Sequence, residues 1–249
     1  DNTQTLSKII DAARSIYKID EYQKVKDIYL NSGELTDDVA NKYLKRGEFG
    51  ELILHLILRD FHNTLPLLSK IYFKDSIGHT VHGFDAVHID PVNKTLWLGE
   101  SKLYIDPKKG IGDLINDVEE HFKADYLNSE FNLIAKKIRH VQNSPELEYW
   151  LDILSTGGKL SDKLTKINIP LLCTYSCDSF LKYDNEKSPD FSAYYENKIL
   201  MLKKYFDENY KHPLKNHLNI ILMLFPVSNK IELVKKLHQK LSLIQQIGG

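Results

Sequence analysis

The chain has 249 residues, of which 42% are hydrophobic and 27% are charged, with 33 Lys and Arg against 34 Asp and Glu. This composition is typical of a globular protein with a sizeable core, and the lack of a run of about 18 apolar residues argues against a membrane span. A net charge of −1 also argues against an autonomous nucleic-acid binder, because such proteins gain affinity from a basic surface.

The cysteine content indicates a reducing compartment. The first residues, "DNTQTLSKII", have neither the basic nor the apolar region of a signal peptide, and Cys173 and Cys177 are the two cysteines of the chain. We therefore expect a cytoplasmic location and free thiols that pack as small buried hydrophobes.

The N-terminal part of the chain is predicted to be helical. Apolar residues recur at helical spacing over residues 5–30, and a second helix is expected from about residue 35. We assign residues 1–45 to an N-terminal helical extension, a candidate docking surface for a partner, and residues 46–249 to the main domain. That domain opens with an apolar helix over residues 49–61.

The rest of the chain alternates between strands and helices. Three strands are predicted in succession, in "LSKIYFKDS", "HGFDAVHID" and "TLWLGESKLYID". Helical residues 110–127 and 128–156, the latter broken at Pro145, and a polar loop "STGGKLSDK" precede the strand "INIPLLCTYS". A helix over residues 194–210, a strand in "HLNIILMLFPV" and a helix over residues 229–247 complete the pattern.

This order predicts an α/β fold, with a mixed β-sheet flanked by helices and its later strands joined by crossovers. The segments "LWLG" and "NIILMLF" are apolar at nearly every position, which indicates a sheet covered on both faces.

Charged residues interrupt two adjacent predicted strands. Glu100 and Lys102 project to the same face of their strand, and Asp85, a residue type disfavoured inside strands, lies in the strand before. A hairpin would bring Asp85 close to Glu100, and two such carboxylates repel unless a cation holds them. Oxygen ligands of this kind suit Mg²⁺, or Mn²⁺ in its place, with Lys102 balancing charge and orienting a water. The alternative is a buried structural ion pair.

A third acid could come from the apolar helix. Glu48, Glu51 and His55 share one face of it, so either carboxylate could polarise a water or complete a metal shell, while His55 is expected in the core or behind the site. Lys108 and Lys109 precede a helix N-terminus, which favours phosphate, and they are candidate DNA contacts.

Two further groups of polar residues favour structural interpretations. The spacing of His79, His82 and His88 is unsuited to a zinc site. Asp113, Asp117 and His121 share a helix face, which we expect to be solvated. The tyrosines of the predicted helix at residues 194–210 are expected to pack within the protein.

The arrangement of the charged residues resembles the PD-(D/E)xK nuclease superfamily, with an Asp on one strand, Glu-x-Lys on the next and an acidic helix upstream. Gly47-x-x-x-Glu51 resembles the Gly-x-x-x-Glu helix of several members, which favours Glu51 over Glu48. The longer sequence pattern "HGFDAVHI…LWLGESKLY…GIGDLINDVEEH" resembles a narrower family, HamA, whose members are the nuclease subunit of Hachiman anti-phage defence. One departure is Gly83-Phe84 before Asp85, where the superfamily name has Pro.

The resemblance implies a function and a set of roles. Asp85, Glu100 and the carbonyl of Ser101 would ligate one or two Mg²⁺ ions, and Lys102 would help to generate or place the hydroxide nucleophile. It also implies DNA as the substrate and a helicase partner, HamB, which would explain the missing basic excess. We therefore expect a metal-dependent DNA nuclease. The alternatives are a catalytically silent subunit that regulates a helicase and an RNA-directed nuclease, since nothing in the sequence reads a 2′-OH.

Overall fold

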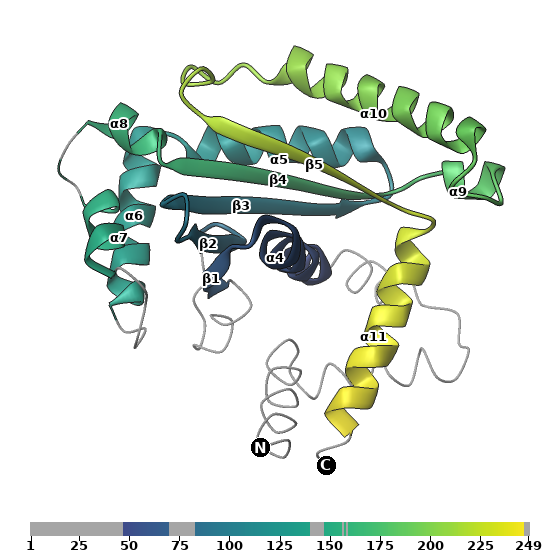
Figure 1. Cartoon of the computed structure of the whole chain (residues 1–249), viewed down its shortest axis with the longest axis horizontal. Helices are drawn as coiled ribbons and strands as arrows, with labels where there is room; N and C mark the ends of the chain where they lie inside the picture. The colour runs from purple at the N-terminus through teal and green to yellow at the C-terminus, as the bar shows by residue number, and fades with distance from the viewer. Residues whose placement is uncertain (1–46, 70–82, 140–146, 156, 158, 247–249) are drawn as a thin grey trace.

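A computed structural model describes residues 47–69, 83–139, 147–155, 157 and 159–246 of the chain. The predicted N-terminal extension, Pro145, His79, His82 and most of "LSKIYFKDS" lie outside the described residues. Within these ranges the elements alternate largely as the sequence predicts, with strands grouped first and helical crossovers later (Figure 1). None of the described helices combines the length and the hydropathy that a bilayer crossing requires.

The five strands of the described residues form one mixed sheet in the order β1-β2-β3-β4-β5. The first three run antiparallel, and β3, β4 and β5 run parallel, so the prediction of a mixed sheet is confirmed. Their bounds are Leu65–Ser69, Ala86–Asp90, Thr95–Tyr104, Ile167–Ser176 and Asn219–Val227.

Helices cover both faces of this sheet (Figure 1). One face carries α5 and α10, and the other carries α4, with α11 descending from the end of β5. These four helices span Pro107–His121, Pro189–Asn209, Glu48–His62 and Lys230–Gln246. The shorter or peripheral helices α6, α7, α8 and α9 span Ala124–Ile138, Leu147–Ile153, Leu160–Leu164 and Ser179–Lys182.

Strand β3 lies at the centre and separates two parts of the core. Leu96 and Leu98 pack with α5 residues such as Leu114, whereas Trp97 packs with Leu54 of α4. Alternate side chains of a strand point to opposite faces. Even-numbered residues of β3 therefore face α5 and odd-numbered residues face α4, which decides where each polar side chain of the strand points.

Two details differ from the sequence prediction. The segment predicted as one helix over residues 110–127 is divided, because α5 ends at His121 and α6 begins at Ala124. The predicted polar loop contains the short helix α8. Strand β5 lies at an edge of the described sheet and its residues are half-buried or exposed, but Ile220 and Leu222 pack against the core on one face and Ile221 packs against the core on the other, as expected of a sheet covered on both faces. An apolar run alone does not distinguish a central strand from an edge strand.

Candidate active site

The β2–β3 hairpin brings Asp85 beside Glu100. Ala86 pairs with Gly99 at the end of the ladder, and Asp85 occupies the bend immediately before β2, where continued register places it opposite Glu100. Its Oδ2 accepts hydrogen bonds from the backbone N of Ser101 at 2.9 Å and from Ser101 Oγ at 3.0 Å. The carboxylate of Asp85 thus accepts the hydrogen bond that a backbone carbonyl of β2 would accept if the ladder continued. These bonds hold its side chain against β3.

The same geometry orients the carbonyl of Ser101. In a strand, the N–H and C=O of one residue point to the same side. Since the Ser101 N–H donates to Asp85, the Ser101 carbonyl also points toward the β2 side, beyond the last ladder pair at Ala86 and Gly99. The Ser101 carbonyl is therefore on the same side of β3 as Asp85.

Three side chains of β3 pair with three side chains of α5. Glu100 Oε1 lies 2.7 Å from His121 Nδ1, Lys102 Nζ lies 2.5 Å from Asp117 Oδ2, and the Tyr104 hydroxyl donates to Asp113 Oδ2 at 2.5 Å. Two residues of a strand advance roughly 6.7 Å and four residues of a helix roughly 6 Å, so the spacings match. We call these three pairs the β3–α5 ladder.

The β3–α5 ladder corrects one sequence interpretation. The helix face formed by Asp113, Asp117 and His121 was predicted to be solvated, but each member contacts a side chain of β3. The missed signal was the correspondence between polar residues at i, i+2 and i+4 of the strand and at i, i+4 and i+8 of the helix that follows it. His121 is further held by Tyr126, whose ring stacks on it at 4.7 Å.

Burial makes Glu100 costly to ionise. Its side chain is enclosed, with 2% of the residue exposed. Burial and, to a smaller extent, the charge of Asp85 raise the pKa of Glu100 to about 7, although the hydrogen bond from His121 acts in the opposite direction. Two carboxylates that repel at close range form a site where a cation would be stabilised.

Lys102 remains a cation at neutral pH. Burial lowers the pKa of its ammonium, but the hydrogen bond to Asp117 and the nearby carboxylates Glu100 and Asp85 outweigh that effect, and the net pKa is raised. The side chain therefore supplies a fixed positive charge beside the paired carboxylates.

Helix α4 approaches the hairpin from the opposite face. A Cβ on Gly50 would lie 3.4 Å from Ser101 Oγ, so the helix crosses β3 closely at this residue. The next residue, Glu51, is 6% exposed, whereas Glu48 is only half-buried. This burial agrees with the choice of Glu51 as the helix acid, and its role at the site stays a prediction.

A pair of histidines lies on the α4 side of the hairpin. His88 of β2 is fully buried, with Nε2 2.6 Å from His55 Nδ1 and Nδ1 2.8 Å from Thr64 Oγ1. Burial, assisted by His55, lowers the pKa of His88 to about 3. His88 is therefore neutral and hydrogen-bonded within the core.

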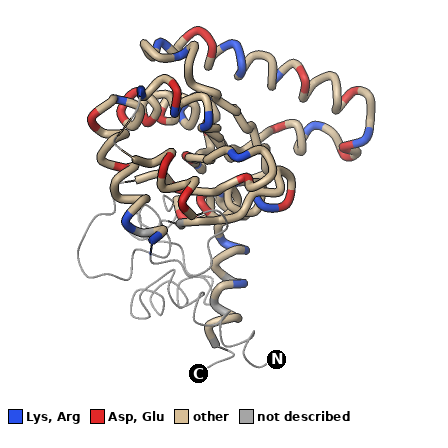
Figure 2. The backbone as a smooth tube through the Cα atoms, turned by 60° about the vertical axis from the view of Figure 1, so that its left-hand side comes forward, with Lys and Arg blue, Asp and Glu red and all other residues tan. Residues whose placement is uncertain are grey.

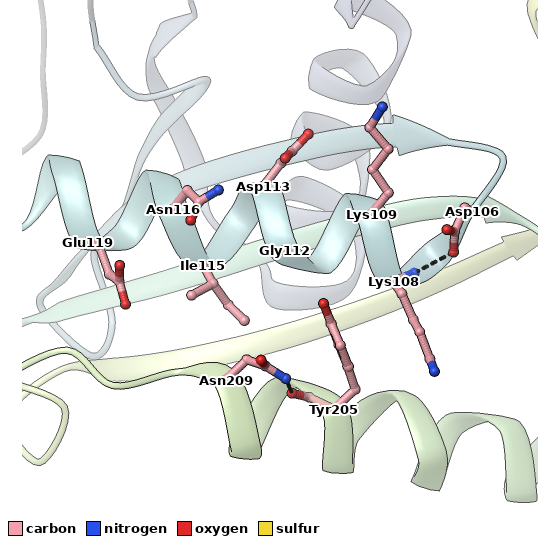
Figure 3. A pocket seen from close by; sticks show the side chains of 10 residues that line it. All are labelled: Asp106, Lys108, Lys109, Gly112, Asp113, Ile115, Asn116, Glu119, Tyr205 and Asn209. Carbon is pink, nitrogen blue, oxygen red and sulfur yellow. Dashed lines mark hydrogen bonds between the residues drawn. The ribbon is translucent and has the colours of Figure 1, made fainter.

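The two candidate DNA-contacting lysines diverge at the start of α5. A hollow of about 470 Å³ lies between α5 and α10. Figure 3 shows Lys108 pointing from α5 toward α10, whereas Lys109 and Asp113 point away from it. Lys108 Nζ lies 5.6 Å from the ring centre of Tyr205, and Lys109 Nζ lies 5.6 Å from that of Tyr104. Of the two lysines, Lys109 is therefore the one whose ammonium lies near a side chain of β3.

The donor set limits which metal the site could hold. Among the described residues, no group of three or more His, Cys, Asp or Glu side chains lies close enough together to hold a metal ion. An ion at the hairpin would have two carboxylates, a backbone carbonyl and water as ligands. This all-oxygen set fits Mg²⁺ or Mn²⁺, which accept one or two carboxylates and keep several waters, and it does not fit a structural zinc.

The fold and this site together define an α/β protein with a mixed five-stranded sheet, consistent with a nuclease-like domain. The family model described as HamA matches residues 4–241, and the chain therefore belongs to the HamA family. Membership implies that it is a component of Hachiman anti-phage defence. The search of curated proteins found no match.

Proposed function

We propose that the chain is a metal-dependent DNA nuclease of the PD-(D/E)xK type, the effector subunit of a helicase–nuclease defence complex. One observation carries the proposal. The β2–β3 hairpin brings Asp85 to Glu100, with Lys102 on the same face of β3 as Glu100. A protein that needed only a stable strand would gain more from apolar residues at these buried positions.

Asp85, Glu100 and the Ser101 carbonyl would hold the Mg²⁺ or Mn²⁺ ion. The pKa of Glu100, raised to about 7 by burial and by Asp85, supports this assignment, because such a carboxylate gains most from a neighbouring cation. A divalent ion bound there would lower the pKa of a water and stabilise negative charge on a phosphate.

Lys102 acts in this proposal as a cation rather than as a base. Its raised pKa keeps the ammonium protonated, so it can orient an attacking water and stabilise charge on the phosphate. Asp117 and His121 are positioning residues, since they contact Lys102 and Glu100 and restrict their rotamers. Glu51 would assist from α4.

DNA engagement would depend on the helicase partner, HamB. The chain has a net charge of −1, and Figure 2 shows acidic and basic residues interspersed along its described helices. Such a surface gives little counter-ion release on DNA. The partner would therefore supply most of the affinity, while this chain contributes the chemistry.

The β3–α5 ladder favours a second candidate function. Glu100, Lys102 and Tyr104 each have a partner on α5, as expected of polar residues that only specify packing. On this alternative, the chain is a catalytically silent subunit that binds and regulates the helicase.

A cleavage assay with Mg²⁺, with and without HamB, separates the two candidates. Glu100→Gln and Lys102→Ala should each lower the rate by roughly a hundredfold or more, as is typical when a catalytic group is removed. Glu196→Gln is the matched control, because Glu196 belongs to the other Glu-x-Lys of the chain and is exposed on α10. Equal DNA degradation by all variants contradicts the nuclease. Inactive variants that still bind HamB and still protect cells from phage favour the silent subunit. A matched RNA substrate tests the DNA preference.

A further inference from the structure

Lys230 is a buried cation at the carboxyl end of the parallel strands. It is the first residue of α11, separated from the end of β5 by Ser228 and Asn229, and it is 8% exposed. Its backbone N donates to Ser176 Oγ at 2.9 Å, at the last residue of β4. This bond anchors the start of α11 beside the ends of β4 and β5, as Figure 1 shows.

The ammonium of Lys230 has no carboxylate partner among the described residues. Its one described side-chain interaction is with the ring of Tyr104, whose centre lies 5.8 Å from Nζ. Burial lowers the pKa of Lys230, and no acid in the described part of the chain raises it. An enclosed ammonium without an ion pair is strongly unfavourable, and a cation–π contact is weak by comparison.

The place of Lys230 in its helix adds to this cost. A helix N-terminus carries partial positive charge, so a cation is disfavoured there. The backbone N–H groups of Ile231 and Glu232, in the first turn of α11, donate to Asn229 Oδ1. The side chain of Lys230 is therefore the group at this helix end that needs an anion. A residue that is buried, unpaired and opposed by the helix dipole is better explained by a ligand than by packing.

A second ammonium lies at the same tyrosine. Lys109 Nζ is 5.6 Å from the Tyr104 ring centre, and Lys109 points away from α10 (Figure 3). Tyr104 is on the face of β3 that carries Lys102 and Glu100, and its hydroxyl is bonded to Asp113. Four strand residues separate Tyr104 from Glu100, or roughly 13 Å, so these lysines lie beyond the scissile position but within reach of the same strand of DNA.

We propose that Lys230 and Lys109, which share the Tyr104 ring, bind a non-scissile phosphate of the substrate strand and position that strand at Glu100 and Lys102. This inference rests on the proposed nuclease function. The site takes a phosphodiester, because two ammonium groups around one aromatic ring offer charge and donors without reading a base. Binding of this phosphate supplies the anion that Lys230 lacks.

The test is DNA affinity measured without cleavage. The complex of the full chain with HamB is titrated against a fluorescent DNA oligonucleotide in chelator at several salt concentrations, with the chain as wild type, Lys230→Met, Lys230→Arg or Lys236→Met. Lys236 is the matched control, an exposed lysine of the same helix. Lys230→Met should weaken binding roughly tenfold and reduce the salt slope by about one, while Lys230→Arg restores binding and Lys236→Met has little effect.

Stability separates a ligand-binding lysine from a structural one. Lys230→Met should unfold at the same or a higher urea concentration than wild type, because it removes an unpaired buried charge. Three results would each overturn the phosphate site. They are lower stability of Lys230→Met than of wild type, wild-type affinity and salt slope in Lys230→Met, and no measurable DNA binding by the wild-type complex with HamB. Failure of the proposed function is a different result, namely DNA cleavage by Glu100→Gln at the wild-type rate.

Discussion

Replacing Glu100 by glutamine should stabilise the metal-free protein at alkaline pH. The pKa of Glu100 is raised from 4.5 to about 7, mainly by burial and then by Asp85. A carboxyl group with a raised pKa binds its proton more tightly in the native state than in the unfolded chain. This stabilisation is fully present below about pH 4.5 and is lost as the pH rises through about 7. Glutamine does not titrate, so the variant keeps its stability.

The size of the effect follows from the two pKa values. A carboxyl group with a pKa of 4.5 in the unfolded chain and about 7 in the native state loses roughly 3 kcal/mol of stabilising free energy when it ionises. Because Glu100 is 2% exposed, solvent screening removes little of this amount. The free energy of unfolding of Glu100→Gln, relative to wild type, should rise by roughly 2 to 3 kcal/mol between about pH 5 and about pH 8.

Urea unfolding in chelator, followed over this pH range, measures the difference directly. Glu196→Gln is again the matched control, and its stability should follow that of wild type at every pH because Glu196 is exposed. Added Mg²⁺ should stabilise wild type at alkaline pH and leave Glu100→Gln nearly unchanged. A constant difference between Glu100→Gln and wild type across the pH range would refute the assignment of a raised pKa to Glu100.

Three further predictions test the surroundings of the hairpin. Asp117→Asn should lower the pKa of Lys102, since Asp117 raises it, and NMR titration of the lysine side chain would contradict this if the pKa stayed the same. Gly99→Ala should cost about 1 to 3 kcal/mol in urea unfolding, because its Cβ would lie 2.8 Å from a buried side-chain carbon of α4; Gly47→Ala, in open space, is the control. Because its pKa is lowered to about 3, His88 should reduce the free energy of unfolding by about 2 kcal/mol as the pH falls from about 7 to about 5. Urea unfolding of His88→Gln should show no such decrease, and an equal decrease in this variant would contradict the assignment.

The sequence predicts the architecture well where hydrophobic period and turn chemistry agree. The bounds of β4 match the predicted strand, and α4 matches the predicted apolar helix within one residue at either end. Two results were less accessible. The break between α5 and α6 interrupts an unbroken helical pattern at Phe122, and the edge position of β5 depends on long-range pairing that local apolarity does not encode.

The candidate site was predictable in part. Two-residue spacing places Glu100 and Lys102 on one face, and a short hairpin brings Asp85 to them, because both follow from strand geometry. The partners Asp117 and His121 were not predicted as such, since the register between a helix and a strand depends on their connection and packing. Lys230 lies more than a hundred residues from β3 in the chain, and its proximity to Tyr104 arises only from the parallel crossovers.

The central claim is that Asp85 and Glu100 share a divalent ion. Crystals of the full chain soaked in Mn²⁺ at about pH 8, where Glu100 is ionised, can be measured for anomalous scattering at the manganese edge. The account predicts a peak at the end of the β2–β3 hairpin, about 2.0 to 2.3 Å from a carboxylate oxygen of each residue, that is absent from Glu100→Gln. A map without this peak in wild type, or with the same peak in the variant, would contradict it.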